Sequence, residues 1–137
     1  MTHRHSLPNL ALHGCNRPAP SARRTDLVLF TSGQHRGPSS AEIPYGATKG
    51  ALHQITATLA DALAEREITV NCVNPGPTDT GWATPDQHSF VTRHMPRGRW
   101  NTPAEAASVV ALLLSSDAAT ITGQVIDAEG GFRRCTH

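Results

Sequence analysis

The stretch Ile68-Thr69-Val70-Asn71-Cys72-Val73-Asn74-Pro75-Gly76-Pro77 decides the fold. β-Branched residues recur in it up to Asn74, which predicts a strand over 68–74, and the proline and glycine that follow end that strand. Upstream, residues 45–66 carry an apolar residue every three to five positions and no proline, which predicts a helix. Further upstream, the apolar run 27–32 is typical of a strand that is buried on both faces of a sheet.

The C-terminal part of the chain predicts another helix and another strand. Thr102 is a suitable N-cap, with Pro103 at the first helical position and Glu105 at the capping-box position, so we expect a helix from there to about residue 116. Residues 124–127 form the third expected strand. The order strand, helix, strand, helix, strand is that of an α/β fold whose parallel sheet is covered by helices.

Two segments have no regular pattern. Residues 78–102 show no period, and at about 25 residues they exceed ordinary connections, so we expect a functional lid or a disordered loop. Residues 1–26 are expected to be a disordered leader unrelated to the fold, because 1–25 hold four arginines, three prolines and no acidic residue. A targeting peptide is the less favoured interpretation of this leader. The single domain is then 27–137.

Composition excludes several classes of partner. The chain has 137 residues and a net charge of +1, which provides no field for holding a phosphate backbone. No stretch approaches the roughly 18 apolar residues of a membrane-spanning helix. Three cysteines without a C-x-x-C spacing fit neither a disulfide framework nor a zinc site, and the eight histidines share no metal-ligand spacing. We therefore expect a cytoplasmic protein without a nucleic-acid, membrane or metal partner.

One pair of side chains predicts chemistry. Lys49 is the only lysine and Tyr45 the only tyrosine, four residues apart at the start of a predicted helix. They share one helix face, where the ammonium charge favours ionisation of the phenol, although such a pair alone is usually an ordinary surface pair. Ser32 ends the first strand at the edge of the sheet where ligands bind, although a serine there is also a common strand-end cap. Together the three side chains predict acid/base chemistry at this edge.

Five short motifs occur one after another along the chain. They are Thr31-Ser32-Gly33, Tyr-x-x-x-Lys at 45–49, Asn-x-Val-x-Pro-Gly at 71–76, Ile-Thr-Gly-Gln at 121–124 and Glu-Gly-Gly-Phe at 129–132. In this order they resemble the catalytic half of the short-chain dehydrogenase/reductase family, in particular the branch that includes 3-oxoacyl-acyl-carrier-protein reductases. The resemblance covers about residues 27–132 and implies the C-terminal part of a Rossmann-type parallel sheet.

The resemblance implies an NAD(P)-dependent oxidoreductase that interconverts a carbonyl and an alcohol of a small-molecule substrate by hydride transfer. It implies that Tyr45 is the general acid and base, that Lys49 favours its ionisation and binds the nicotinamide ribose, and that Ser32 holds the substrate oxygen. Trp82 and Trp100 would pack either on the substrate or in a cluster of their own. The further cofactor contacts implied are Pro75, Gly76, Thr78 and Thr80.

The sequence also departs from the family pattern. The Gly-rich turn T-G-x-x-x-G-x-G, which places a pyrophosphate at a helix N-terminus, has no counterpart before Leu27, and neither has the residue that selects NAD or NADP. The strand 27–32 is therefore expected to leave one apolar edge unpaired, where another chain can pair. A truncated, non-catalytic remnant that acts as an interaction module is the alternative to the oxidoreductase. The resemblance also allows for a homo-oligomer.

Overall fold

The computed structural model describes residues 24–134. The strands are β1 (Thr25–Phe30), β2 (Ile68–Asn74) and β3 (Val125–Asp127), and the α-helices are α1 (Ile43–Leu63), α2 (Pro85–His94) and α3 (Pro103–Leu113). Three short 3-10 turns are η1 (Gly33–Arg36), η2 (Ala64–Arg66) and η3 (Ser116–Ala118). Residues 1–23 lie outside the described residues, so the leader stays a prediction for them, whereas Thr25 and Asp26 belong to β1.

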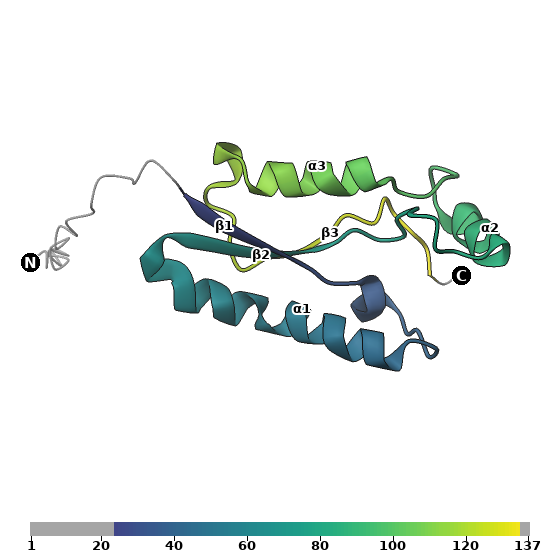
Figure 1. The fold of residues 1–137 in the computed structure, drawn as a ribbon, viewed down its shortest axis with the longest axis horizontal. Helices are drawn as coiled ribbons and strands as arrows, with labels where there is room; N and C mark the ends of the chain where they lie inside the picture. Colours follow the sequence, from purple (N-terminus) through teal and green to yellow (C-terminus); the bar gives the residue numbers. More distant parts are fainter. Residues whose placement is uncertain (1–23, 135–137) are drawn as a thin grey trace, which may run out of the picture.

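A three-stranded parallel sheet forms the middle layer, in the order β1-β2-β3. Figure 1 shows α1 along one face of this sheet, α3 along the other, and α2 at the end where the strands finish. Parallel neighbours need a crossover connection, and α1 and α3 provide the two that this sheet requires. The predicted α/β class with a parallel sheet is confirmed.

The central strand β2 holds the core, because it has a strand on each side and a helix on each face. Val73 has no exposed surface and packs with Leu113 of α3 and with Ala118. Asn71 is equally buried, but its side-chain amide donates to the carbonyl of Ile121 at 2.8 Å. The polar residue in the core is therefore satisfied by a hydrogen bond.

The outer strand β1 is apolar on both faces. Among residues 24–134 it pairs with β2 only. Leu27 is 38% exposed and Phe30 is 40% exposed. Since their odd spacing places them on opposite faces of the strand, both faces of this edge present apolar surface. The expected unpaired apolar edge is thus present in the described part of the chain.

Helix α2 is the largest difference from the expected structure. The expectation of an irregular segment over 78–102 is wrong for residues 85–94, which are helical. The Thr84 hydroxyl accepts from the Gln87 N–H (3.3 Å), and the Gln87 side chain accepts from the Thr84 N–H (2.9 Å). This capping box starts a helix that buries none of its residues, so the apolar period that predicts most helices is missing.

The other boundaries differ by a few residues. β2 has its predicted bounds, while β1 begins and ends two residues earlier than predicted. α1 begins two residues before Tyr45, and its last predicted turn tightens into η2. α3 begins after Thr102 as predicted, since the Thr102 hydroxyl accepts from the Glu105 N–H at 3.2 Å. The capping residues therefore predict the start of this helix correctly, whereas its end, expected near residue 116, lies at Leu113.

Two kinds of site find no support in residues 24–134. No helix there has the length and apolar character needed to cross a membrane. No three His, Cys, Asp or Glu side chains gather there as ligands for a metal ion. Cys72 is a free, buried thiol whose pKa is raised by that burial, so it behaves as a small apolar side chain.

Replacing Gly50 with alanine is expected to stabilise the protein by about 0.5–1 kcal/mol, because glycine in a helix interior costs backbone entropy. Gly50 lies within α1, and a Cβ there would meet no atom within 4 Å. The free energy of unfolding in urea measures the gain. Gly46→Ala is the matched control, since its Cβ would lie 2.9 Å from the Gln34 side-chain oxygen and gain less. A lower unfolding free energy for Gly50→Ala would contradict the prediction.

Candidate active site

Ser32 lies where β1 ends, at the carboxyl edge of the sheet. Its backbone is extended (φ −140°, ψ 164°) as the chain enters η1, and its side chain makes no capping hydrogen bond to this turn. The residue is partly buried. Its hydroxyl is therefore not committed to the turn, which answers the possibility that Ser32 is only a strand-end cap.

Tyr45 and Lys49 lie together on the first turns of α1. Tyr45 is 48% exposed. The Lys49 ammonium donates to the carbonyl of Phe30 at 3.0 Å and lies 5.7 Å from the centre of the Tyr45 ring. A carbonyl at the end of β1 thus holds the only lysine near the only tyrosine. The predicted juxtaposition of these two side chains is present in the structure.

A second hydrogen bond joins the same two elements. The Thr31 hydroxyl donates to the carbonyl of Lys49 at 2.9 Å, opposite in direction to the bond from Lys49 to Phe30. The start of α1 is therefore bonded to the strand end before Ser32 through both the backbone carbonyl and the side chain of Lys49. Among the described residues, no hydrogen bond joins the side chains of Ser32 and Tyr45.

A cavity of about 380 Å³ lies between η1 and α1. Ser32 and Gln34 line it from the strand end, and Gly46, Gly50 and His53 line it from α1. Tyr45 and Lys49 are not among its lining residues. Ser32 thus borders a cavity whose lining on α1 includes Gly46, Gly50 and His53 but neither Tyr45 nor Lys49.

The loop after β2 is folded tightly on itself. Gly76 has a left-handed φ of 66°, and its N–H donates to the Asn74 side-chain oxygen at 3.1 Å. The Thr78 hydroxyl donates to the carbonyl of Gly76 at 3.2 Å, whereas Thr80 is exposed. The Thr78 hydroxyl is occupied within the loop, so its backbone and the Thr80 hydroxyl are the groups that remain for a ligand.

Sequence reasoning missed Asn101, which holds this loop in place. The residue is 3% exposed, and its side-chain amide donates to the carbonyls of Pro75 (2.8 Å) and Ala128 (3.0 Å). Its backbone forms a parallel bridge with Thr78. One buried amide therefore joins the loop after β2 to the end of β3. No motif in the sequence predicts this role of Asn101.

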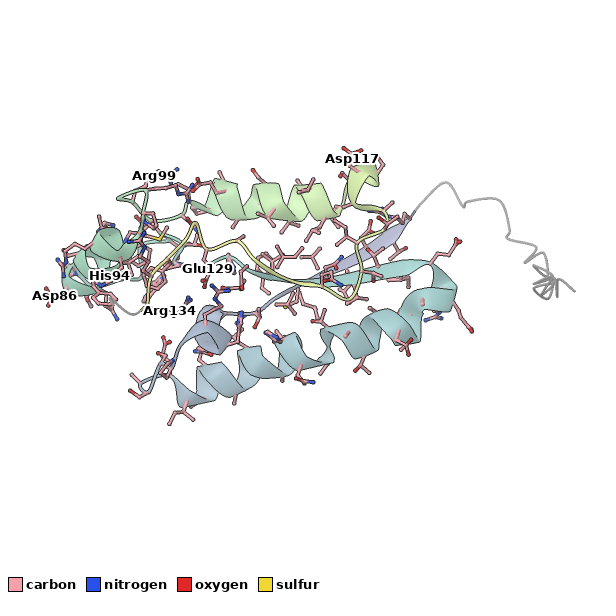
Figure 2. All side chains as sticks on the ribbon, turned by 180° about the vertical axis from the view of Figure 1, so that it is seen from behind. Asp86, His94, Arg99, Asp117, Glu129 and Arg134 are labelled. Atoms are coloured by element: carbon pink, nitrogen blue, oxygen red, sulfur yellow. The ribbon has the colours of Figure 1, made fainter. Side chains whose placement is uncertain are left out.

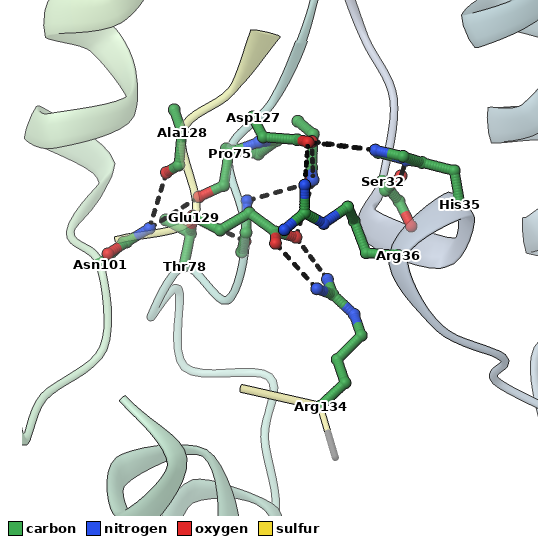
Figure 3. Close-up of polar contacts among 12 residues, drawn as sticks. Ser32, His35, Arg36, Pro75, Thr78, Asn101, Asp127, Ala128, Glu129 and Arg134 are labelled. Atoms are coloured by element: carbon green, nitrogen blue, oxygen red, sulfur yellow. Dashed lines mark hydrogen bonds and ion pairs between the residues drawn. The ribbon is translucent and has the colours of Figure 1, made fainter. Parts of the chain in front are cut away.

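A group of charged residues at the end of β3 was also missed (Figure 3). Asp127 accepts from Asn74 (2.8 Å) and pairs with His35 (3.1 Å) and Arg36 (3.2 Å). Partial burial raises the pKa of Asp127, but the hydrogen bonds from Asn74 and His35 and the nearby positive charges outweigh it, so the pKa lies below its ordinary value. Asp127 is therefore a carboxylate at neutral pH.

The two tryptophans pack on each other. Trp100 is 4% exposed, donates from its ring nitrogen to the carbonyl of His88 (3.1 Å), and stacks on the His88 ring at 5.3 Å. Trp82 meets Trp100 edge to face at 5.9 Å and remains 60% exposed. The two tryptophans thus form a cluster that attaches α2 to the segment before α3, and packing on a substrate stays a prediction.

The chain matches a known family over most of its length. The family model described as enoyl-(acyl carrier protein) reductase matches residues 15–133, and so begins within the segment expected to be a leader. The uncharacterized oxidoreductase YjdA of Bacillus subtilis is 48% identical over 108 residues, which are 79% of this chain and 43% of that protein.

Solved structures agree with this match. The angucycline C-6 ketoreductase LanV with bound NADP has a TM-score of 0.73 and 41% identity, over 77% of this chain and 42% of that chain. A 3-oxoacyl-[acyl-carrier protein] reductase with bound NAD from Brucella melitensis has a TM-score of 0.72 and 31% identity, over 80% of this chain and 41% of that chain. The chain spans less than half the length of these proteins. By its parallel sheet, its Tyr45–Lys49 turn and these matches, the chain belongs to the short-chain dehydrogenase/reductase family of oxidoreductases.

Proposed function

We propose that the protein is an NAD(P)-dependent oxidoreductase that interconverts a carbonyl and an alcohol of a small-molecule substrate by hydride transfer. The single observation that carries the proposal is the Lys49 ammonium, which is held 3.0 Å from the Phe30 carbonyl and 5.7 Å from the centre of the half-exposed Tyr45 ring. Two similar solved proteins hold NADP and NAD, which supports a nicotinamide dinucleotide and leaves the choice between them open.

The described residues fit the nicotinamide end of such a cofactor. Lys49 has three N–H donors and gives one to Phe30, so two remain for ribose hydroxyls beside Tyr45. The loop that begins with Pro75 and Gly76 would shape the pocket, with the backbone of Thr78 and the hydroxyl of Thr80 near the carboxamide. The pyrophosphate end would be held by the family's Gly-rich turn, which has no counterpart before Leu27.

A nicotinamide dinucleotide, when bound, would supply or accept the hydride, and residues of this chain transfer the proton. Ser32 donates its O–H to the carbonyl oxygen of the substrate and holds it in place. Tyr45 transfers its phenolic proton to the same oxygen as negative charge develops there, and the Lys49 ammonium stabilises the phenolate that remains. In the reverse direction the Tyr45 phenolate takes the proton of the alcohol.

The edge of β1 that has no partner strand among residues 24–134 has a place in this proposal. A further parallel strand, from whichever segment holds the rest of the dinucleotide, could pair with this edge, beside the exposed side chains of Leu27 and Phe30. The same edge carries the alternative function, in which the chain is a non-catalytic interaction module that pairs with another polypeptide. The two functions differ in whether the chain binds a nicotinamide dinucleotide.

Titration of the protein with NADH and with NADPH, followed by nicotinamide fluorescence, tests the proposal. We expect saturable binding of at least one of them. Lys49→Met should weaken it about 10- to 100-fold, since it removes hydrogen bonds from a charged donor. The exposed Arg66→Met is the matched control and should leave the affinity unchanged. Absence of saturable binding would overturn the oxidoreductase function for this chain and leave the interaction module.

A further inference from the structure

Glu129 is a buried carboxylate that the proposed reaction does not use. It is 5% exposed and follows β3 at the carboxyl edge of the sheet. Its oxygens accept from the side-chain amide of Asn74 at 2.7 Å and from both terminal nitrogens of the Arg134 guanidinium. Figure 2 shows Arg134 and Glu129 between the layers formed by α1 and α3. A carboxylate removed from water needs such partners, because desolvation penalises its charge.

Arg134 also covers the turn that follows Ser32. Gly33 is buried, and a Cβ on it would overlap the Arg134 guanidinium and the Glu129 carboxylate. A Cβ on Gly37 would lie 3.0 Å from Cδ of the same arginine. The Arg134 side chain therefore lies against the backbone of η1 at both ends, where glycines leave room for it.

A second carboxylate holds the same turn. Asp127 pairs with His35 and Arg36, which both belong to η1. The Asn74 amide donates to Asp127 at 2.8 Å as well as to Glu129, so one side chain at the end of β2 links both carboxylates. Figure 3 shows these contacts between the end of β3 and the turn after β1. The ends of all three strands are thereby joined by one set of side chains.

We propose that Glu129 and Arg134 are positioning residues, which hold η1 and thereby fix where the backbone presents the Ser32 hydroxyl. Ser32 is then held from both sides, because its other neighbour, Thr31, donates to the Lys49 carbonyl at 2.9 Å. A hydroxyl that stabilises developing charge works best when it is held in place before the reaction. What Ser32 does rests on the proposed function, whereas the anchoring of the turn does not.

Backbone 15N relaxation of the full chain tests the anchoring without any cofactor. In Arg134→Met, which keeps an apolar stem and removes the guanidinium, we expect the order parameters of Gly33 and Gln34 to fall from about 0.85 to below about 0.6. Those of β2 should stay unchanged. Arg133→Met is the matched control, because Arg133 is exposed and adjacent, and it should leave the turn rigid.

Two further variants keep the test decisive if Arg134→Met folds poorly. Glu129→Gln is nearly isosteric and should loosen the turn in the same way, since the charge that binds Arg134 is gone. The double variant Glu129→Gln with Arg134→Met leaves no unpaired buried charge. Order parameters that stay high in η1 would overturn the proposal, because Glu129 and Arg134 would then not hold the turn. Order parameters that fall equally in η1 and β2 would also overturn it, because the pair would then only stabilise the fold as a whole.

The rate of carbonyl reduction by the protein, with NAD(P)H and a simple ketone, tests the consequence for Ser32. Arg134→Met should lower kcat at least 10-fold with the KM for the dinucleotide unchanged, and Arg134→Lys should restore part of the rate through its single charged donor. An unchanged kcat in a variant with a mobile turn would overturn the positioning role. A wild-type protein without NAD(P)H binding would instead overturn the proposed function, while the relaxation result would still stand.

Discussion

Tyr45→Phe is expected to lower the rate of carbonyl reduction by about 10²- to 10⁴-fold, the range that one positioned general acid contributes. The variant keeps the ring beside Lys49 and removes only the hydroxyl that carries the proton. Lys49 should stay in place, since the Phe30 carbonyl holds its ammonium independently of the phenol. Steady-state oxidation of NADH or NADPH with a simple ketone measures the loss.

Binding and stability serve as controls for this variant. Tyr45 is 48% exposed, so its hydroxyl supports little of the core, and the free energy of unfolding should be unchanged within about 0.5 kcal/mol. The affinity for the dinucleotide should change much less than the rate. Ser32→Ala should reduce the rate less severely, by about 10- to 10³-fold, since it removes one donor to the substrate oxygen. A Tyr45→Phe protein with the wild-type rate would show that another group moves the proton.

The parts of the fold that could be predicted are those that short stretches determine. β2 has its predicted bounds because its series of β-branched residues ends at a proline and a glycine. The start of α3 follows from Thr102 and Glu105, which cap each other three residues apart. α2 has a similar capping box, but it buries no residue. Its sequence therefore lacks the apolar periodicity that predicts a helix.

The candidate site divides in the same way. Tyr45 and Lys49 are one helical turn apart, so their proximity follows from helix geometry alone. The groups around Ser32 come from distant parts of the chain, since His35 and Asp127 are separated by 92 residues. Their contact depends on how the ends of β1 and β3 align across β2, which no local pattern encodes. Asn101 and Arg134 were missed for the same reason.

Gly76→Ala is expected to cost about 2–5 kcal/mol of unfolding free energy, from backbone strain together with overlap in a packed region. Gly76 has a φ of 66°, and a Cβ there would lie 2.6 Å from the Cα of Glu129. Because that atom belongs to the backbone of a buried residue, no side-chain rotation can relieve the contact. Urea denaturation of the variant and the wild-type protein measures the difference.

Gly98→Ala separates the two causes of this loss. Gly98 has nearly the same φ, 64°, but a Cβ there would meet nothing within 4 Å. Gly98→Ala should therefore lower the free energy of unfolding by only about 1–2 kcal/mol, which is the strain of a left-handed backbone. The excess loss in Gly76→Ala then measures how closely the loop after β2 packs against Glu129. If both variants lose the same unfolding free energy, the backbone at Glu129 shifts to make room for the Cβ. The packing between this loop and Glu129, which holds the turn after Ser32, would then not be rigid.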